Sequence, residues 1–122
     1  EVWQQLHEML TEKGLLIGAV PNCSSYDAQR YGEYWAAYDV PRHLWHFTPG
    51  TIQQLASRHG FIMAARHPMP FDAFYVSMLS EKHRGSSCSF LKGMYVGILA
   101  WFSALGRKER SSSMIYVFRK KR

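Results

Sequence analysis

The spacing of apolar residues changes from helical to extended near residue 14. Between residues 2 and 13, apolar side chains recur at the spacing of one helix face, namely at Val2, Leu6, Met9 and Leu10. Gly14 is of the residue type that commonly ends a helix. The next run, Leu15–Val20, has no polar side chain, which predicts a central strand covered on both faces. A helix followed by a buried strand is half of an α/β repeat.

A second helix and two further strands are predicted by the same reasoning. Thr48 is a good N-cap residue and Pro49 suits the first helical position, so a helix begins there and runs to Gly60. The segments Phe61–His67 and Met114–Phe118 are predicted strands. The chain therefore alternates helix and strand, as α/β proteins do.

Two more helices are predicted over residues 71–80 and 90–105. The second carries large apolar residues at helical spacing, and these are Leu91, Tyr95, Ile98, Phe102 and Leu105. Its apolar run is interrupted by Lys92 and is shorter than the ~20 residues that span a bilayer. We favour a helix that covers the sheet or the mouth of a substrate pocket. The cations at Arg107 and Lys108 keep an interfacial helix at a membrane surface as the second interpretation.

The connection between the first strand and the second helix is long and irregular. Residues 21–47 lack a clean period and are rich in aromatic side chains, which are Tyr26, Tyr31, Tyr34, Trp35, Tyr38, Trp45 and Phe47. A connection of this length usually has a function or contains short helices. It leaves the carboxyl end of the first predicted strand, where open α/β sheets bind ligands. We therefore expect this connection to border a ligand.

Composition indicates one domain, or part of one, with a real core. Of the 122 residues, 47% are hydrophobic and 15% aromatic, which excludes a disordered chain. The two cysteines, Cys23 and Cys88, form no Cys-x-x-Cys motif, and we find no signal peptide. Reduced thiols in a cytoplasmic protein are the simplest interpretation. A first residue of Glu1 rather than Met suggests a piece of a longer protein.

The charge of the chain offers an alternative function. The formal net charge is +6, and most of the excess lies late in the sequence. A small basic module could bind nucleic acid or an anionic membrane surface. A solvated basic tail after the last strand accounts for the same residues without any partner, and we favour that explanation.

Two stretches carry a family resemblance. The segment GLLIGAVPN is followed by YGEYWAAYDVPRHLWHFTPGTIQQLASRHGF. Together they resemble the C-terminal half of class I S-adenosylmethionine-dependent methyltransferases, in the group with a PRHLxHF(T/S) segment after a strand that ends in VPN. The later stretches FDAFYVSMLSEKHRG and SSSMIYVFRKK also resemble the end of that family. The resemblance covers nearly the whole chain.

The resemblance implies a specific sheet. In that family six strands are parallel, and the last strand is inserted antiparallel between the fifth and the sixth. Leu15–Val20 would then be the fifth strand, Phe61–His67 the sixth and Met114–Phe118 the seventh. The expected fold is therefore α/β, with the last three strands of a Rossmann-like methyltransferase sheet, the final one antiparallel, and flanking helices.

The same family holds its methyl donor on elements that this sequence lacks. In that family the donor site requires a glycine-rich turn after the first strand of the seven-stranded sheet and an acidic residue at the end of the second. The nine glycines of this chain form no GxGxxG. We expect residues 1–122 to be the C-terminal, acceptor-side part of the domain, without the N-terminal S-adenosylmethionine-binding half. The whole protein would methylate a small-molecule or lipid-like acceptor and needs no specific nucleic acid. The fragment alone would be inactive.

Candidate site residues come from the connection. His43 and His46 are candidate catalytic residues, because a neutral histidine can accept a proton from a hydroxyl near pH 7. Arg42 could pair with a carboxylate or phosphate of the substrate. Tyr34, Trp35 and Trp45 would form an apolar wall, and Asn22 would face the ligand from the end of the strand. These seven residues are the predicted catalytic and substrate-binding set.

Less specific interpretations of these residues remain open. Each side chain could be structural, with His46 bonded to a backbone carbonyl and Asn22 making a turn. The two histidines with Cys23 could also bind zinc, but no fourth ligand is placed by spacing and we do not favour a metal site. The first strand would expose an edge that normally pairs with a missing strand, so a homo-oligomer through that edge is expected.

Overall fold

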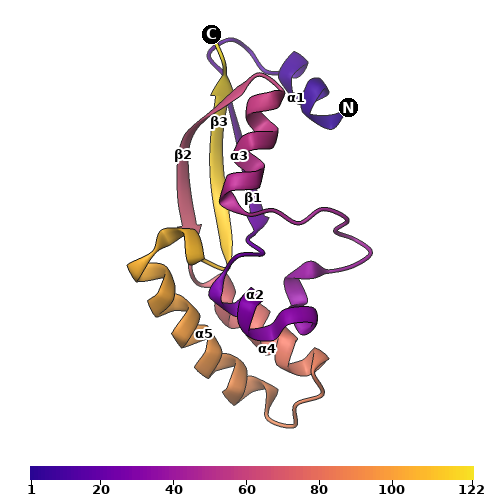
Figure 1. Ribbon diagram of the computed structural model, residues 1–122, viewed down its shortest axis with the longest axis vertical. Coiled ribbons are helices and arrows are strands. Elements are labelled where there is room, and N and C mark those ends of the chain that lie inside the picture. Colours follow the sequence, from indigo (N-terminus) through magenta and orange to yellow (C-terminus); the bar gives the residue numbers. More distant parts are fainter.

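Three strands form one open sheet in the computed structural model, which describes all of residues 1–122. They are β1 (Leu15–Pro21), β2 (Phe61–Met69) and β3 (Ser113–Lys120). β3 lies between the other two and runs antiparallel to both (Figure 1). The α/β class and the antiparallel final strand predicted from the sequence are confirmed. The order β1-β3-β2 also puts the last strand between the two earlier ones, as expected.

Two helices cover one face of this sheet. They are α1 (Val2–Met9) and α3 (Pro49–Arg58), and Figure 1 shows α3 lying along the strands. The residues they enclose form the sheet cluster, which consists of Ile52, Ala56, Phe61, Met114, Tyr116 and Phe118. α3 begins as predicted, because the Thr48 hydroxyl accepts a hydrogen bond from the Thr51 amide and the Thr51 hydroxyl accepts one from the Thr48 amide.

The first helix is shorter than its periodicity predicts. α1 ends at Met9, because Leu10 has extended backbone angles (φ −80°, ψ 136°). Leu10 then packs against the sheet cluster. Gly14 is needed beside it, since a Cβ atom at Gly14 would lie 2.8 Å from the Leu10 side chain. The glycine therefore permits close packing after the helix rather than ending the helix itself.

The opposite face of β1 is uncovered, so the prediction of a strand buried on both faces is wrong. Leu15 and Ile17 are 56% and 65% exposed, whereas Leu16 and Val20 point to the sheet cluster. Side chains alternate between the two faces of a strand, and in this chain α1 and α3 cover only one of them. β1 is an edge strand within these residues, which agrees with the expectation that its outer neighbour is missing.

A group of helices lies beyond the carboxyl ends of β1 and β2 (Figure 1). The longest are α4 (Asp72–His83) and α5 (Ser89–Gly106), which pack side by side, and α2 (Tyr26–Tyr31) contacts both. Short 3₁₀ turns accompany them as η1 (Gly32–Tyr34), η2 (Ala36–Tyr38) and η3 (Lys108–Arg110). The residues buried between these segments form the helical cluster, which consists of Ala28, Tyr31, Trp35, Val76 and Val96.

α5 is oriented differently from the expectation. Its small residues, Gly93 and Gly97 among them, face inward, and a Cβ atom at Gly93 would lie 2.5 Å from the Met78 Cα of α4. The large apolar residues face outward. α5 therefore lies against α4 and α2 instead of over the sheet or the predicted substrate pocket. The reason is that glycine allows the two helix backbones to approach more closely than leucine or phenylalanine would.

Candidate functional site

The connection that leaves β1 returns to it near its carboxyl end. Residues 26–38 form α2, η1 and η2, and the chain then runs back so that Asn22 and Phe47 lie in a short parallel bridge. The Cys23 amide donates to the Phe47 carbonyl at 3.0 Å. The segment PRHLWHF is thereby held beside the end of the strand, as the argument from open α/β sheets predicts.

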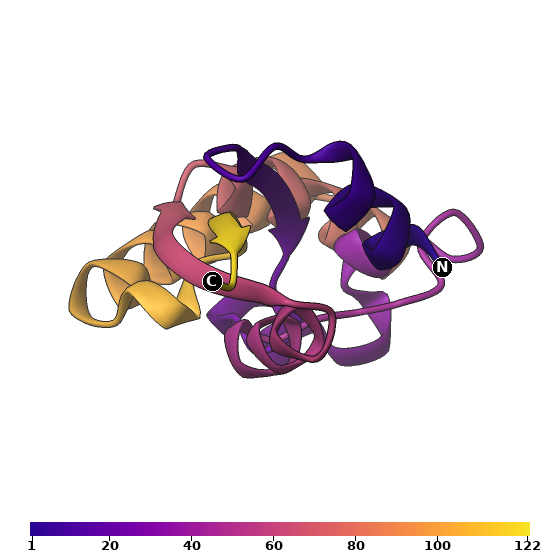
Figure 2. The same ribbon diagram turned by 90° about the horizontal axis from the view of Figure 1, so that it is seen from above.

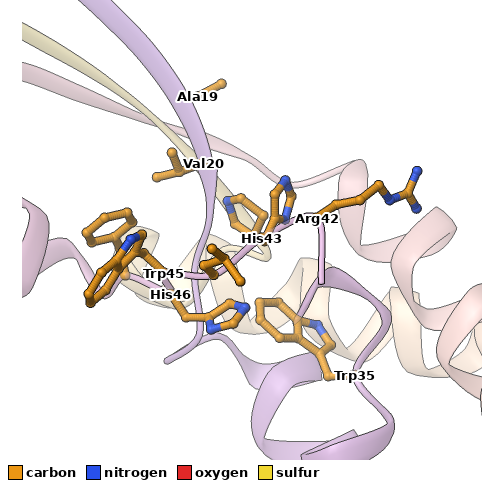
Figure 3. Close-up of a pocket in the computed structure, with 10 residues that line it drawn as sticks. Ala19, Val20, Trp35, Arg42, His43, Trp45 and His46 are labelled. Carbon is orange, nitrogen blue, oxygen red and sulfur yellow. The ribbon is translucent and has the colours of Figure 1, made fainter. Parts of the chain in front are cut away.

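A pocket of about 370 Å³ lies between β1 and this returning segment (Figure 3). We call it the loop pocket, and its lining residues are Ala19, Val20, Pro21, Trp35, Arg42, His43, Leu44, Trp45, His46 and Phe47. Five of the seven predicted site residues are in this lining. Asn22 and Tyr34 are not. Six of the ten lining residues are hydrophobic, as is common for sites that bind small organic molecules.

His46 is held by the 3₁₀ turn before it. Its Nε2 atom lies 2.8 Å from the Tyr38 carbonyl oxygen, and its ring meets the Tyr38 ring edge to face at 4.9 Å between centroids. A carbonyl only accepts hydrogen bonds, so Nε2 carries a proton in this arrangement. The neutral ring then has its lone pair on Nδ1, which is the one atom of His46 that can take a proton.

His43 is more accessible and faces a carboxylate. Its side chain is about half exposed, and its Nδ1 atom lies 3.9 Å from Asp39 Oδ2. This separation is too long for a hydrogen bond but suits an ion pair once the ring is protonated. Nε2 has no protein partner. The arrangement would leave Nε2 free to accept a proton and place Asp39 where it stabilises the resulting cation.

Asp39 was missed by the sequence interpretation. It accepts hydrogen bonds from Arg42 Nε at 3.0 Å and from Arg42 Nη2 at 2.6 Å. Its backbone is left-handed, with φ 45°, and this turn directs the chain from η2 towards the pocket. The signal available in the sequence is spacing, since Asp39 precedes Arg42 and His43 by three and four residues.

Arg42 and Trp45 form the open side of the pocket. The Arg42 side chain is 81% exposed and shares only part of its donors with Asp39, so the rest can meet an anionic group. Trp45 is 80% exposed. In Figure 3 its side chain lies apart from the side chains of the other labelled residues. An indole offers a ligand a large apolar face together with one N–H donor. Both residues are therefore suited to contact a ligand.

Trp35 forms the buried wall opposite. Its Nε1 atom donates to Asp27 Oδ2 at 2.8 Å, and Ser112 Oγ donates to the same oxygen at 2.7 Å. Asp27 is fully buried, and its other oxygen has no hydrogen-bond partner in the chain. The sequence interpretation missed Asp27 as well. The Asp27 carboxylate fixes the plane of the Trp35 indole and so sets the buried wall of the loop pocket.

Asn22 has a structural place rather than a ligand-facing one. It is buried, and its Nδ2 atom donates to the carbonyl oxygens of Glu109 at 2.6 Å and Ser111 at 2.9 Å. Its Oδ1 atom accepts from the amide and the hydroxyl of Ser24. All four bonding positions of the amide are therefore used within the protein. Asn22 joins the end of β1 to the segment after α5.

Tyr34 lies outside the loop pocket. Its ring is in contact with the Arg84 guanidinium, whose carbon lies 5.9 Å from the ring centroid. Cys23 is half-buried, and burial raises the pKa of its thiol, which disfavours the thiolate that a metal would bind. The chain has no group of three or more His, Cys, Asp or Glu side chains that could hold a metal ion.

No family model and no curated protein matches this chain.

Proposed function

We propose that this chain is the acceptor-side part of a class I S-adenosylmethionine-dependent methyltransferase domain with a Rossmann-like sheet, and that the loop pocket receives the methyl acceptor. The observation that carries the proposal is the return of PRHLWHF to the carboxyl end of β1, where it lines a pocket with five of the expected residues. The strand order β1-β3-β2 supports it, since this is the order that the resemblance implies.

The residues present do not make a site for the methyl donor. The glycine-rich turn of that family follows the first strand of its sheet, whereas β1 would be the fifth, and the nine glycines of this chain form no GxGxxG. The donor, which supplies the methyl group, would have to be held by residues other than these. What this chain contributes is the acceptor side alone.

The pocket can position an acceptor and remove its proton. Trp35 and Trp45 would enclose an apolar or aromatic part of a small molecule or a lipid-like chain. Arg42 would bind an anionic group near the rim. When the acceptor is a hydroxyl, His43 Nε2 would accept its proton, and the Asp39 carboxylate would stabilise the imidazolium that forms. His46 could act in the same way only through Nδ1.

The first test is donor binding by titration calorimetry on the protein translated from the complete reading frame that contains these residues. We expect saturable binding of S-adenosylmethionine to that protein and little or none to residues 1–122 alone. An intact, folded protein that binds no donor would contradict the proposal.

The second test uses labelled methyl transfer to a panel of phenols, hydroxy acids and hydroxylated lipids. His43→Ala should lower kcat by 10²-fold or more, the usual contribution of a general base, with little change in KM. Arg42→Ala should mainly raise KM for anionic acceptors. A matched control is His59→Ala, since His59 bonds only to the Leu55 carbonyl in α3. Equal activity in all three variants would remove the loop pocket from the reaction.

The exposed edge of β1 supports a further part of the proposal. Leu15 and Ile17 are exposed on the same strand whose outer edge has no partner strand in this chain. We expect residues 1–122 to self-associate through this edge, because an unpaired apolar edge strand is a template for another strand. Light scattering that shows a monomer at high concentration would contradict this association.

A further inference from the structure

The outward face of α5 is apolar along its whole length. We call the residues of this face the α5 stripe, and they are Leu91, Tyr95, Ile98, Phe102 and Leu105, each between 42% and 68% exposed. They follow one another at three- and four-residue spacing, so they lie on one side of the helix. Contiguous exposed apolar surface of this kind marks contact with something other than water.

The stripe cannot turn inward. On the opposite side of α5, a Cβ atom at Gly97 would lie 2.9 Å from the Phe74 Cα atom, and the clearance at Gly93 is smaller still. These contacts fix the rotation of α5 against α4. The small face is used within these residues, so only something other than residues 1–122 can cover the large face.

Cations gather at both ends of the stripe. Between residues 82 and 110 there are six of them, namely Lys82, Arg84, Lys92, Arg107, Lys108 and Arg110, against a single acidic residue. That residue, Glu109, forms an ion pair with Arg66. At the start of α5, the side chains of Arg30, Arg84 and Lys92 border an open hollow of about 510 Å³, which Tyr95 and the buried Glu81 also line. The charge of the region is strongly positive.

We propose that the α5 stripe lies in the plane of an anionic membrane surface, with its apolar side chains at the acyl boundary and the flanking cations at the lipid phosphates. Apolar residues between cations are the combination that binds such surfaces. This inference is independent of the proposed methyl transfer. Figure 2 shows α5 at the periphery of the molecule, on the far side from α1, where a flat surface can reach it.

Other occupants fit the observations less well. A second copy would bring two strongly positive regions together, which like-charge repulsion opposes. Nucleic acid would gain from the cations but not from leucine, isoleucine and phenylalanine. α5 is long and apolar enough by composition to cross a membrane. However, its 18 residues span only about 27 Å of a core about 30 Å thick, and the glycine contacts hold it against α4.

The test is vesicle co-sedimentation of the full chain, with phosphatidylcholine alone and with phosphatidylcholine and phosphatidylglycerol at 7:3. We expect partition into the anionic vesicles to be at least tenfold stronger, and to weaken at least tenfold in 0.5 M salt. The double variant Ile98→Glu, Phe102→Glu should lose binding at least tenfold. The matched control is the double variant Val2→Glu, Met9→Glu, which adds the same charge at two exposed apolar residues of α1, and it should bind within twofold of the unmodified chain.

The contribution of charge is tested separately. Replacement of Arg107 or Lys108 by Gln should weaken binding about fivefold for each cation removed. Because the glutamate variants can misfold, Ile98→Trp gives a second readout. The fluorescence that this tryptophan adds to that of the four native ones should be quenched by brominated acyl chains more strongly than the fluorescence that Val2→Trp adds on α1.

Five results would overturn the proposal. One is the absence of binding to either vesicle, and another is equal binding by the Ile98→Glu, Phe102→Glu variant while circular dichroism shows it folded. A third is equal quenching at positions 2 and 98. The fourth is salt-sensitive binding to duplex DNA in place of vesicles. The fifth is a dimer that becomes monomeric in the Phe102→Glu variant.

Discussion

The two hydrophobic clusters of this chain are built on different principles. The sheet cluster is made of apolar side chains from β2, β3 and α3, all of them large except Ala56, and its single polar side-chain group is the Tyr116 hydroxyl. The helical cluster is small, and buried polar residues surround it, namely Asp27, Ser77, Ser80, Glu81, Ser111 and Ser112. One region depends on burial of apolar area and the other on specific hydrogen bonds and close backbone contact.

This difference shows where the candidate functions can reside. A cluster held by packing is stiff and tolerates few changes. In the helical region, Trp35 is fixed by Asp27, η2 is fixed by Ser80, and α5 is fixed by glycine contacts. Each of these contacts positions a surface that faces outward, either the loop pocket or the α5 stripe. If the two proposals hold, the sheet half supports the half that would meet ligands.

The largest expected effect tests the sheet cluster. Phe61→Ala should lower the free energy of unfolding by about 3–5 kcal/mol, because it removes a buried aromatic ring and leaves a cavity. The neighbour Ile62, on the other face of β2, is partly exposed, and Ile62→Ala should cost about 1 kcal/mol or less. Urea denaturation measures both. Equal losses would show that the open face is covered in solution.

The next effect tests the polar contacts of the helical cluster. Asp27→Ala should cost about 2–3 kcal/mol, since the Trp35 indole and the Ser112 hydroxyl would lose a buried charged acceptor. Near-ultraviolet circular dichroism should report the loss of order at Trp35. As a control, Glu8→Ala removes an exposed hydrogen bond from Gln4 and should change stability by less than about 0.5 kcal/mol. Similar losses of stability in both variants would contradict the claim that the helical cluster depends on buried hydrogen bonds.

A third prediction concerns the contact between α4 and α5. Gly93→Ala should destabilise the protein by about 1–3 kcal/mol, because the new methyl group would overlap the backbone at Met78. Gly106→Ala, at the end of the same helix, meets no atom within 4 Å and should be neutral or slightly stabilising. Thermal unfolding followed at 222 nm compares the two variants. A neutral Gly93→Ala would mean that α5 packs more loosely than described.

The smallest effect is a pH dependence in the sheet cluster. Burial raises the pKa of Tyr116 to about 12, against about 10 for an exposed tyrosine. The folded protein therefore retains a proton that the unfolded chain loses. Its contribution to stability is complete below pH 10 and is lost as the pH rises towards 12, with a loss of about 1 kcal/mol by pH 11. Tyr116→Phe should flatten this decline in urea titrations.

The helical cluster supplies the matching test. Burial and the nearby Glu81 carboxylate both raise the pKa of Tyr31, whose hydroxyl donates to Glu81. As for Tyr116, the folded protein keeps the Tyr31 proton that the unfolded chain loses. The contribution of Tyr31 to the free energy of unfolding is therefore complete at neutral pH and falls above pH 10. Tyr31→Phe should remove part of the alkaline decline that remains in Tyr116→Phe. If the loss of stability at alkaline pH is the same in both variants as in the unmodified chain, titrating groups other than these two tyrosines cause it.

Much of the architecture followed from local sequence signals. Thr48 and Pro49 started α3 where expected, and the three predicted strands were found with ends displaced by two residues or fewer. These are positions where a cap, a proline or a β-rich run decides the local structure. The connection and its pocket were also predicted, because the position after a strand depends on the topology of α/β sheets rather than on fine geometry.

The errors have a common physical origin. The period of α5 identified its apolar side but not the direction in which it faces, and the spacing of Gly93 and Gly97 was the signal that small residues face the neighbouring helix. Burial of β1 depends on partners that periodicity does not reveal. Asp27, Asp39 and Asn22 acquire their roles from contacts between distant or turn-shaped segments, such as the bond from Asn22 to the Ser111 carbonyl.

The central place of β3 sets the order in which the sheet can assemble. Leu15 pairs with Arg119 and Phe61 with Lys120, so neither pairing exists until the last strand has been synthesised. Contacts between such distant residues slow folding. While the chain is still emerging from the ribosome, β1 and β2 have no strand between them, and a chaperone or a neighbouring nascent chain would meet them unpaired.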